Sequence, residues 1–376
     1  MAGPSEDSDL QAALADLEPE QANEVRALLR NADRPVQPGD PRLHHYVPQF
    51  YLKRFADDED RVGVIELAKP SRGHRRVNHV SKVAAIKDFY TIVHVDGHDT
   101  TVVENILGAV DGRAARVIPR IAYGVLAPSD QDRFDFSLWL AFQNVRGPRT
   151  RRQLEAMGET VAKLEISMNT CERSVREFLA KERGEEPNDD DVDEMLNRVR
   201  RGEGFEVVVP QNHAVSSMLQ HGIDSGAFFF DRTWTLLRSD EPVFLTSDHP
   251  IALHQYAEHH HPFFGVGIAT ADEILVPLDR QTVPVAHHFD DFPTKVLRIN
   301  VEEARELNRQ ILQFAYAEVY GHPDDVMQVE SRDLPKANRP VARVDGGPTS
   351  SIILPDGLNA PPSRARPRRF RAARGA

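Results

Sequence analysis

Apolar residues recur at helical spacing through the middle of the chain and at strand spacing on either side of it. Short apolar runs bounded by turn residues, such as residues 62–67 and 243–245, predict strands in the flanking parts. The helical period of the middle is clear in one stretch, whose apolar members are Val103, Ile106, Leu107 and Val110. We therefore predict an α+β protein, in which strand-rich N- and C-terminal parts form one mixed sheet and the helical middle section packs against it.

Proline and glycine divide the predicted helices. Gly147 and Pro148 are expected to kink or end one helix, and a second long helix is predicted from residue 150 to about 181. A last helix is predicted over residues 301 to 320, where Gly321 follows. Its apolar stripe consists of Ala304, Leu307, Ile311, Phe314, Ala315 and Val319.

Composition suggests three regions. Residues 1–40 hold short amphipathic stretches and then several prolines, which predicts a peripheral helical arm. Residues 41–322 carry the regular patterns and form the predicted main domain. Residues 323–376 are rich in Pro, Gly, Ser and Arg, so we predict a largely disordered tail, with one strand possible near Ile352.

The charge balance argues against general nucleic-acid binding by the body of the protein. The chain has 46 basic and 58 acidic residues and a formal net charge of −12, which disfavours phosphate-backbone contacts. The C-terminal tail is the exception and is the candidate nucleic-acid contact. Its arginines are Arg364, Arg366, Arg368, Arg369, Arg371 and Arg374.

The sequence predicts a cytoplasmic protein. No apolar run is long enough to span a bilayer, so no membrane partner is expected. The acidic N-terminus does not have the pattern of a signal peptide. Cys171 is the single cysteine, which excludes an intrachain disulfide.

The strongest chemical signal is the run of residues 44–55, which we call the opening run. It holds His44, His45 and four aromatic residues, a composition typical of an element that is buried on one side. In a strand the two histidines point to opposite faces, so only one can face a given site. That one is a candidate ligand or general base, and the alternative is a packed histidine with a bonded polar tip. Tyr46 and Gln49 follow as candidate binding residues.

Further polar residues lie in separate segments. Asp248 follows an apolar strand in Ser-Asp-His-Pro, where it could bind a metal or act as a base, or bind its own backbone in an Asx turn. Glu104 could supply a second carboxylate, or only stabilise a helix N-terminus. Gln143 and Arg146 share a helix face and, with Arg149, could clamp an anion or form a solvated basic face.

These residues carry a resemblance. The opening run, the Asp88-Phe89-Tyr90 segment and the Phe244–Pro250 segment together resemble the uncharacterised microbial family known as domain of unknown function 4238, over about residues 43–320. The resemblance also includes Glu104, Gln143, Arg146, Arg149, Trp234, Pro277, Leu278 and Asn308. His249 departs from the family pattern, in which asparagine is expected. The family implies a domain boundary and a set of positions, but no reaction.

Two functions remain open. The first is a metal-dependent hydrolase that acts on a phosphodiester or another anionic substrate, with a divalent metal as cofactor. In that hypothesis the catalytic residues are His44, His45, Asp248 and Glu104; the substrate-binding residues are Gln143, Arg146, Arg149, Tyr46 and Gln49; and the metal ligands are His45 and Asp248. The alternative is a non-catalytic module that recognises a ligand, a peptide or nucleic acid. No phosphate loop, dinucleotide fingerprint or Gly-x-Ser-x-Gly elbow is present.

Overall fold

A computed structural model shows how the chain folds. It describes residues 42–335 apart from 70–73, 94–98, 101, 126–128, 206, 260–264 and 289–293, together with residues 23, 26, 27, 343–344 and 352–353. Most of the predicted N-terminal arm and most of the predicted tail, including the arginines from Arg364 to Arg374, lie outside the described residues. The strand expected near Ile352 is present as β15 (Ile352–Ile353), paired with β14 (Arg343–Val344).

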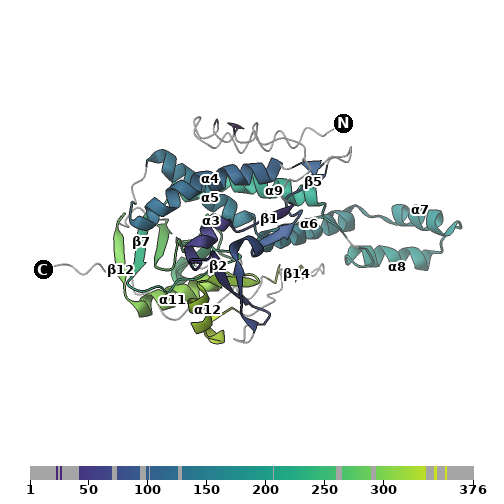
Figure 1. Ribbon diagram of the computed structural model, residues 1–376. Coiled ribbons are helices and arrows are strands. Elements are labelled where there is room, and N and C mark those ends of the chain that lie inside the picture. Colours follow the sequence, from purple (N-terminus) through teal and green to yellow (C-terminus); the bar gives the residue numbers. More distant parts are fainter. Residues whose placement is uncertain are drawn as a thin grey trace.

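The α+β class is confirmed, but the strands form two main sheets rather than one (Figure 1). The four-stranded sheet joins both ends of the domain, because a strand from the N-terminal part pairs with one from the C-terminal part. In spatial order it contains β3 (Arg76–His79), β2 (Arg61–Glu66), β13 (Glu318–Gly321) and β8 (Thr246–Ser247). The five-stranded sheet contains β12 (Val296–Ile299), β7 (Thr233–Ser239), β11 (Thr282–His287), β10 (Glu273–Leu275) and β9 (Ala252–His254). It is mixed, since β12 runs parallel to β7.

One helix forms the centre of the domain. This helix, α5 (Asp130–Val145), is buried on almost every side from Phe134 onward and contacts α4 (Val102–Tyr123), α9 (Gln211–Asp224) and α10 (Gly226–Phe230). Such burial is typical of a helix in the core of a large domain. Together α4, α5 and α9 form a layer above the sheets in Figure 1.

The five-stranded sheet buries both of its faces, as the alternation of its side chains requires. Leu236 and Ile274 point into the main core with α5, whereas Leu237 and Leu275 pack against α11 (Val301–Leu312). The helices α11 and α12 (Pro323–Gln328) therefore lie on the opposite side from α5 (Figure 1).

The opening run forms several short elements rather than one. These elements are β1 (Leu43–His45), α3 (Gln49–Leu52) and the 3-10 turn η1 (Lys53–Phe55). The first pairs with β4 (Ala85–Lys87). The remaining small elements are η3 (Val80–Lys82), β5 (Ile92–Val93), β6 (Asp99–Thr100), η4 (Ala257–His259) and η5 (Ser331–Asp333).

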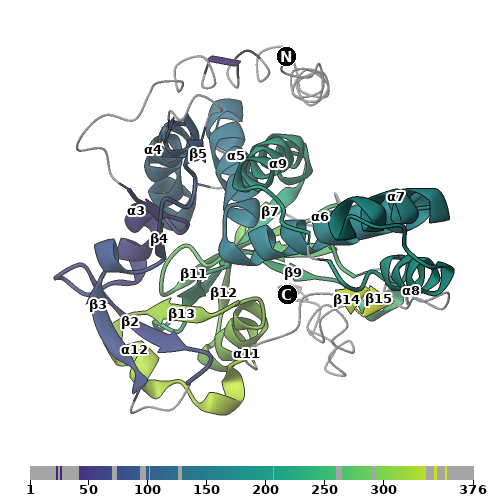
Figure 2. The same cartoon turned by 90° about the vertical axis from the view of Figure 1, so that its right-hand side faces the viewer.

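The long helix predicted from residue 150 to 181 is broken near its middle. The structure has α6 (Pro148–Asn169) and α7 (Glu172–Arg183), with extended backbone at Thr170 and Cys171 between them. They are followed by α8 (Asp189–Arg200), whose apolar residues pack against those of α7. These three helices form an arm that leads away from the body of the protein (Figures 1 and 2).

Two other predicted boundaries change. The helix predicted over residues 301–320 ends at Leu312, and Glu318–Gly321 form a strand that pairs with β2 and β8. The folded body also continues past residue 322, because Val326 of α12 is buried against β2 and β13. No helix within the described parts of the chain is long and apolar enough to cross a membrane.

Candidate functional site

The two adjacent histidines have different surroundings, as strand alternation predicts. His44 is buried, its ring stacks on Tyr90 at 5.6 Å between centroids, and its Nδ1 accepts a hydrogen bond from the backbone N–H of Tyr90 at 2.9 Å. His44 therefore fits the alternative interpretation, in which the histidine is packed in the core and its polar ring nitrogen is hydrogen-bonded.

His45 faces the other way and is only half-buried. Burial lowers its pKa below the usual 6.5, and the backbone of Ser81 and Val80 acts in the opposite direction. A backbone group raises the pKa of histidine when a ring N–H donates to a carbonyl, so we assign the proton to Nδ1. The other nitrogen, Nε2, is shielded from solvent and has no hydrogen-bond partner among the described residues. His45 is thus a neutral imidazole with an available lone pair.

A buried arginine lies near His45 and lowers its pKa. Arg146 follows α5, is fully buried, and places Nη1 at 3.1 Å from both carboxylate oxygens of Asp111 on α4. Its Nε donates to Oε1 of Gln143 at 2.9 Å, and its Nη2 donates to the same oxygen. Gln143 in turn donates to the backbone carbonyl of Tyr46 at 3.1 Å. Gln143 and Arg146, which were predicted to clamp an anion, therefore tie α5 to α4 and to the opening run.

Glu104 belongs to the same cluster. Burial raises its pKa from 4.5 to about 7; Arg146 opposes the rise and Asp111 adds to it. Glu104, Gly108 and Asp111 are spaced four and three residues apart, so they share one face of α4. A side chain at Gly108 would meet nothing within 4 Å, so the surface of α4 is open at the position between Glu104 and Asp111.

Two aromatic residues complete the cluster. The Tyr90 hydroxyl donates to the backbone carbonyl of Arg146 at 2.8 Å, and burial raises the pKa of Tyr90. The Trp139 ring is fully buried, and its indole N–H lowers the pKa of Asp111 although it makes no hydrogen bond of good geometry among the described residues. We call His45, Tyr90, Glu104, Asp111, Trp139, Gln143 and Arg146 the α4–α5 cluster.

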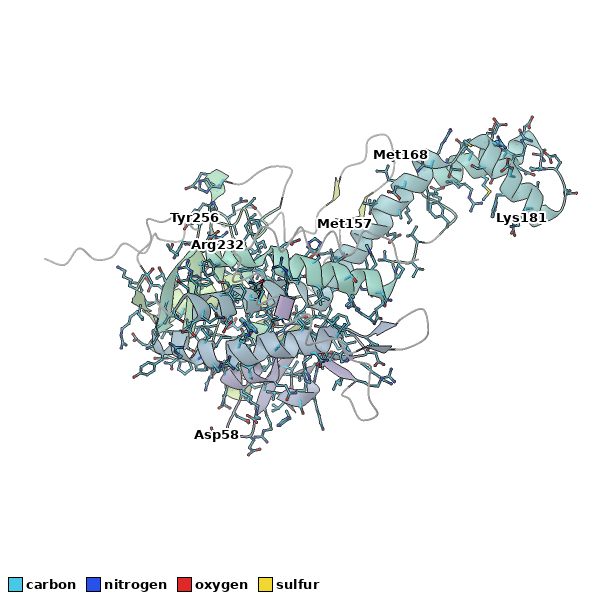
Figure 3. All side chains as sticks on the ribbon, turned by 90° about the horizontal axis from the view of Figure 1, so that it is seen from above. Asp58, Met157, Met168, Lys181, Arg232 and Tyr256 are labelled. Carbon is cyan, nitrogen blue, oxygen red and sulfur yellow. The ribbon has the colours of Figure 1, made fainter. Side chains whose placement is uncertain are left out.

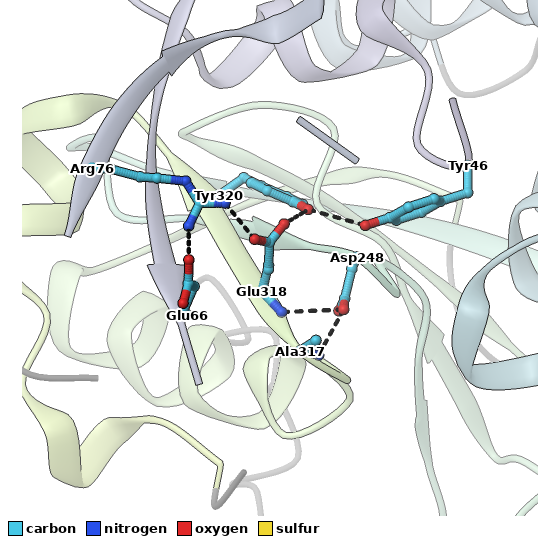
Figure 4. Close-up of polar contacts among 7 residues, drawn as sticks. All are labelled: Tyr46, Glu66, Arg76, Asp248, Ala317, Glu318 and Tyr320. Carbon is cyan, nitrogen blue, oxygen red and sulfur yellow. Dashed lines mark hydrogen bonds and ion pairs between the residues drawn. The ribbon is translucent and has the colours of Figure 1, made fainter. Parts of the chain in front are cut away.

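Asp248 belongs to a second network, shown in Figure 4. Its carboxylate accepts hydrogen bonds from the backbone N–H groups of Tyr316, Ala317 and Glu318, at 2.8, 2.6 and 3.1 Å. Burial raises its pKa to about 6, and these three bonds act in the opposite direction. Asp248 thus fixes the segment that enters β13, which explains why residues 316–320 are not helical.

The rest of this second network consists of side chains around Glu318. Arg76 and Tyr320 both donate to its carboxylate at 2.5 Å, and Arg76 also pairs with Glu66 (Figure 4). The hydroxyl of Tyr46 lies 3.5 Å from that of Tyr320. Tyr46, a predicted binding residue, is therefore buried against the Asp248 network.

The two networks are neighbours and meet at Tyr46, whose backbone carbonyl accepts from Gln143 and whose hydroxyl approaches Tyr320. A side chain at Gly147 would lie 3.3 Å from the carbonyl oxygen of Asp248, so the residue after Arg146 directly approaches the second network. His45 and Asp248 nevertheless have different partners. Within the described ranges, no group of three or more His, Cys, Asp or Glu is arranged to hold a metal ion. The shared metal site stays a prediction without a ligand set in the structure.

The remaining predicted residues lie outside both networks. Arg149 donates to the backbone carbonyl of Phe314 at 2.9 Å and stacks its guanidinium over that ring. Gln49 begins α3 and is half-buried. Asp111, Tyr90 and Trp139 were missed as site residues, although Asp111 could have been found because it lies seven residues after Glu104 on one helix face.

Comparison with known proteins gives one match. The model of the family described as "Protein of unknown function (DUF4238)" matches residues 43–325. No curated protein and no solved structure matches the chain.

Proposed function

The chain belongs to the DUF4238 family, and from the geometry of the α4–α5 cluster we propose that it is a hydrolase of phosphodiesters or other anionic substrates. In this proposal His45 is the general base and Glu104 is the general acid. His45 Nε2 accepts the proton of the attacking water, and the Glu104 carboxyl group donates its proton to the leaving group.

The observation that carries the proposal is the protonation state of these two groups. Glu104 has a pKa of about 7 and can hold a proton near neutral pH, whereas burial keeps His45 neutral. A carboxylic acid and a neutral imidazole in one cluster are the pair that acid–base catalysis requires. Both residues are half-buried and so have an edge at the surface, but Nε2 of His45 is shielded, and water reaches it only through local motion of its neighbours.

The charge of the surroundings supports an anionic substrate. Arg146 and Arg151 both act on Tyr90 as positive charges, and Asp111 is the negative charge beside Arg146. With Glu104 protonated, Asp111 balances Arg146 and Glu155 acts on Arg151, so the cluster has no excess negative charge that would repel an anionic substrate. Arg151 also donates to the backbone carbonyl of Phe89 at 2.7 Å, which fixes its position.

The recognition module has weaker support from the geometry. It would use the aromatic residues of the opening run as a binding face. Tyr51 and Phe55 are fully buried in the core, however, and Tyr46 is 7% exposed. These rings therefore hold the domain together rather than form an open surface.

The test compares matched variants on bis(p-nitrophenyl) phosphate and on single-stranded DNA and RNA. His45→Gln and Glu104→Gln should each lower the rate at least ~100-fold, while neither variant melts at a lower temperature than the wild type. His213→Gln, at an exposed histidine on α9, should change nothing. The rate should fall above about pH 7, as Glu104 loses its proton, and Glu104→Gln should abolish that limb.

Two results would contradict the proposal: full activity in both variants, or no activity of the wild type on any of these substrates. The same assays with EDTA and with added Mg²⁺ or Mn²⁺ test the metal dependence separately. Loss of the rate in EDTA with recovery on metal addition would show that the hydrolase uses a metal.

A further inference from the structure

The arm carries an apolar stripe that nothing in the described chain covers. Met157, Val161, Leu164 and Met168 of α6 are each between 50% and 68% exposed. They are spaced four, three and four residues apart, so they lie along one face of the helix. Figure 3 shows Met157 and Met168 along the same edge of α6. Within α6, which is described in full, no residue is buried.

The spacing is that of a coiled-coil seam. With Leu154 added on its N-terminal side, the stripe alternates steps of three and four residues over two heptads, as the a and d positions of a coiled coil do. We call Leu154, Met157, Val161, Leu164 and Met168 the α6 seam. An apolar seam of this length on a single exposed helix gains stability only when another helix covers it.

We propose that the α6 seam binds the α6 seam of a second copy of this chain, so that the protein forms a homodimer through its arms. The positions that flank the seam carry almost no charge: they are Gln153, Gly158, Thr160, Glu165 and Ser167. Flanking charges select different partners in coiled coils, and a seam without them is compatible with an identical one.

The place of α6 in the fold also favours this partner. The helix leads away from the body and bears α7 and α8 at its far end (Figures 1 and 3). Two arms can therefore meet outside the two bodies. Five apolar side chains cover on the order of half of the roughly 800 Å² per partner of a stable interface. The dimer should accordingly be reversible, with a dissociation constant on the order of micromolar.

The test is sedimentation velocity on the full chain from about 1 to about 200 µM. The wild type should shift from monomer to dimer across this range. The double variant Val161→Lys/Leu164→Lys should stay monomeric, with a dissociation constant at least ~100-fold higher. Ile166→Lys is the matched control, because Ile166 is 38% exposed on the opposite side of the same helix. It should dimerise like the wild type.

Circular dichroism of each variant checks that the fold is retained, and Met157→Gln is a milder seam variant if the double variant does not fold. A wild type that remains monomeric at every concentration would overturn the proposal; this is also the result expected if a segment of the same chain covers the seam. The proposal would also be overturned if Ile166→Lys weakened the dimer as much as the seam variants do, or if the seam variants dimerised as tightly as the wild type.

Discussion

Arg146 after α5 and Asp111 on α4 form a two-pronged ion pair, with one guanidinium nitrogen 3.1 Å from both carboxylate oxygens. The residues are 35 positions apart, and the arginine is completely buried. Because Gln143 binds the same guanidinium and the backbone of Tyr46, this pair joins two helices to the opening run. The candidate acid and base, Glu104 and His45, both experience its charges.

Replacing the arginine should strongly destabilise the protein. Arg146→Met leaves the Asp111 carboxylate without its counter-ion, and removing one partner of a buried pair costs about 3 kcal/mol or more. Adding Asp111→Asn should recover part of this loss, because the unpaired charge is then gone. Urea denaturation of the two single variants and the double variant measures the coupling. Arg305→Met is the control, since Arg305 pairs with Glu302 at the surface and should cost less than ~0.5 kcal/mol. Additive effects of the two buried substitutions would contradict the pairing.

Asp248 should prove structural. In the wild type, three backbone N–H groups share the two carboxylate oxygens of Asp248. Asp248→Asn replaces one of these acceptors with an N–H₂ donor, so the free energy of unfolding should fall by about 2–3 kcal/mol at pH 7.5. The loss should grow as the pH falls below about 6, because the folded wild-type carboxyl then takes up a proton that the unfolded chain binds only at lower pH.

Hydrogen exchange gives a local readout for the same variant. The amides of residues 316–318 should exchange faster in Asp248→Asn than in the wild type. Asp193→Asn, at an exposed site on α8, should alter neither quantity. Unchanged exchange at residues 316–318 would show that the carboxylate does not hold this segment.

Glu104 should make the protein less stable as the pH rises. Its folded-state pKa of about 7 lies above its usual 4.5, so between these values the unfolded chain is ionised while the folded one keeps its proton. Rising pH therefore favours unfolding across this window, and above pH 7 the full penalty is present. After allowance for its partial exposure, we expect about 2 kcal/mol.

Unfolding free energies measured from pH 4 to 8 check this. Glu104→Gln should flatten the slope between pH 4.5 and 7 and exceed the wild type in stability above pH 7. Gly112→Ala, on the open face of the same helix, should stabilise by up to ~1 kcal/mol at every pH. A slope that is equally steep in Glu104→Gln would rule out Glu104 as its source.

Much of the fold could be read along the chain. The period of apolar residues placed α4, α5 and the flanking strands, because a helix or strand that buries one face must repeat its side chains at a fixed interval. The same periodicity showed that only one of His44 and His45 could face a site. It also put Glu104 on a helix, and the opening run with its distant matching segments indicated the family.

Tertiary packing decided the rest. It buried His44 against Tyr90, left His45 half-exposed, paired Arg146 with Asp111, and placed the Asp248 carboxylate against the backbone of residues 316–318. It also turned the end of a predicted helix into β13 and divided the strands between two sheets. The physical reason is the sequence distance over which each kind of information acts. Periodicity records which side of an element is buried, whereas the identity of a polar partner depends on which distant segment packs there.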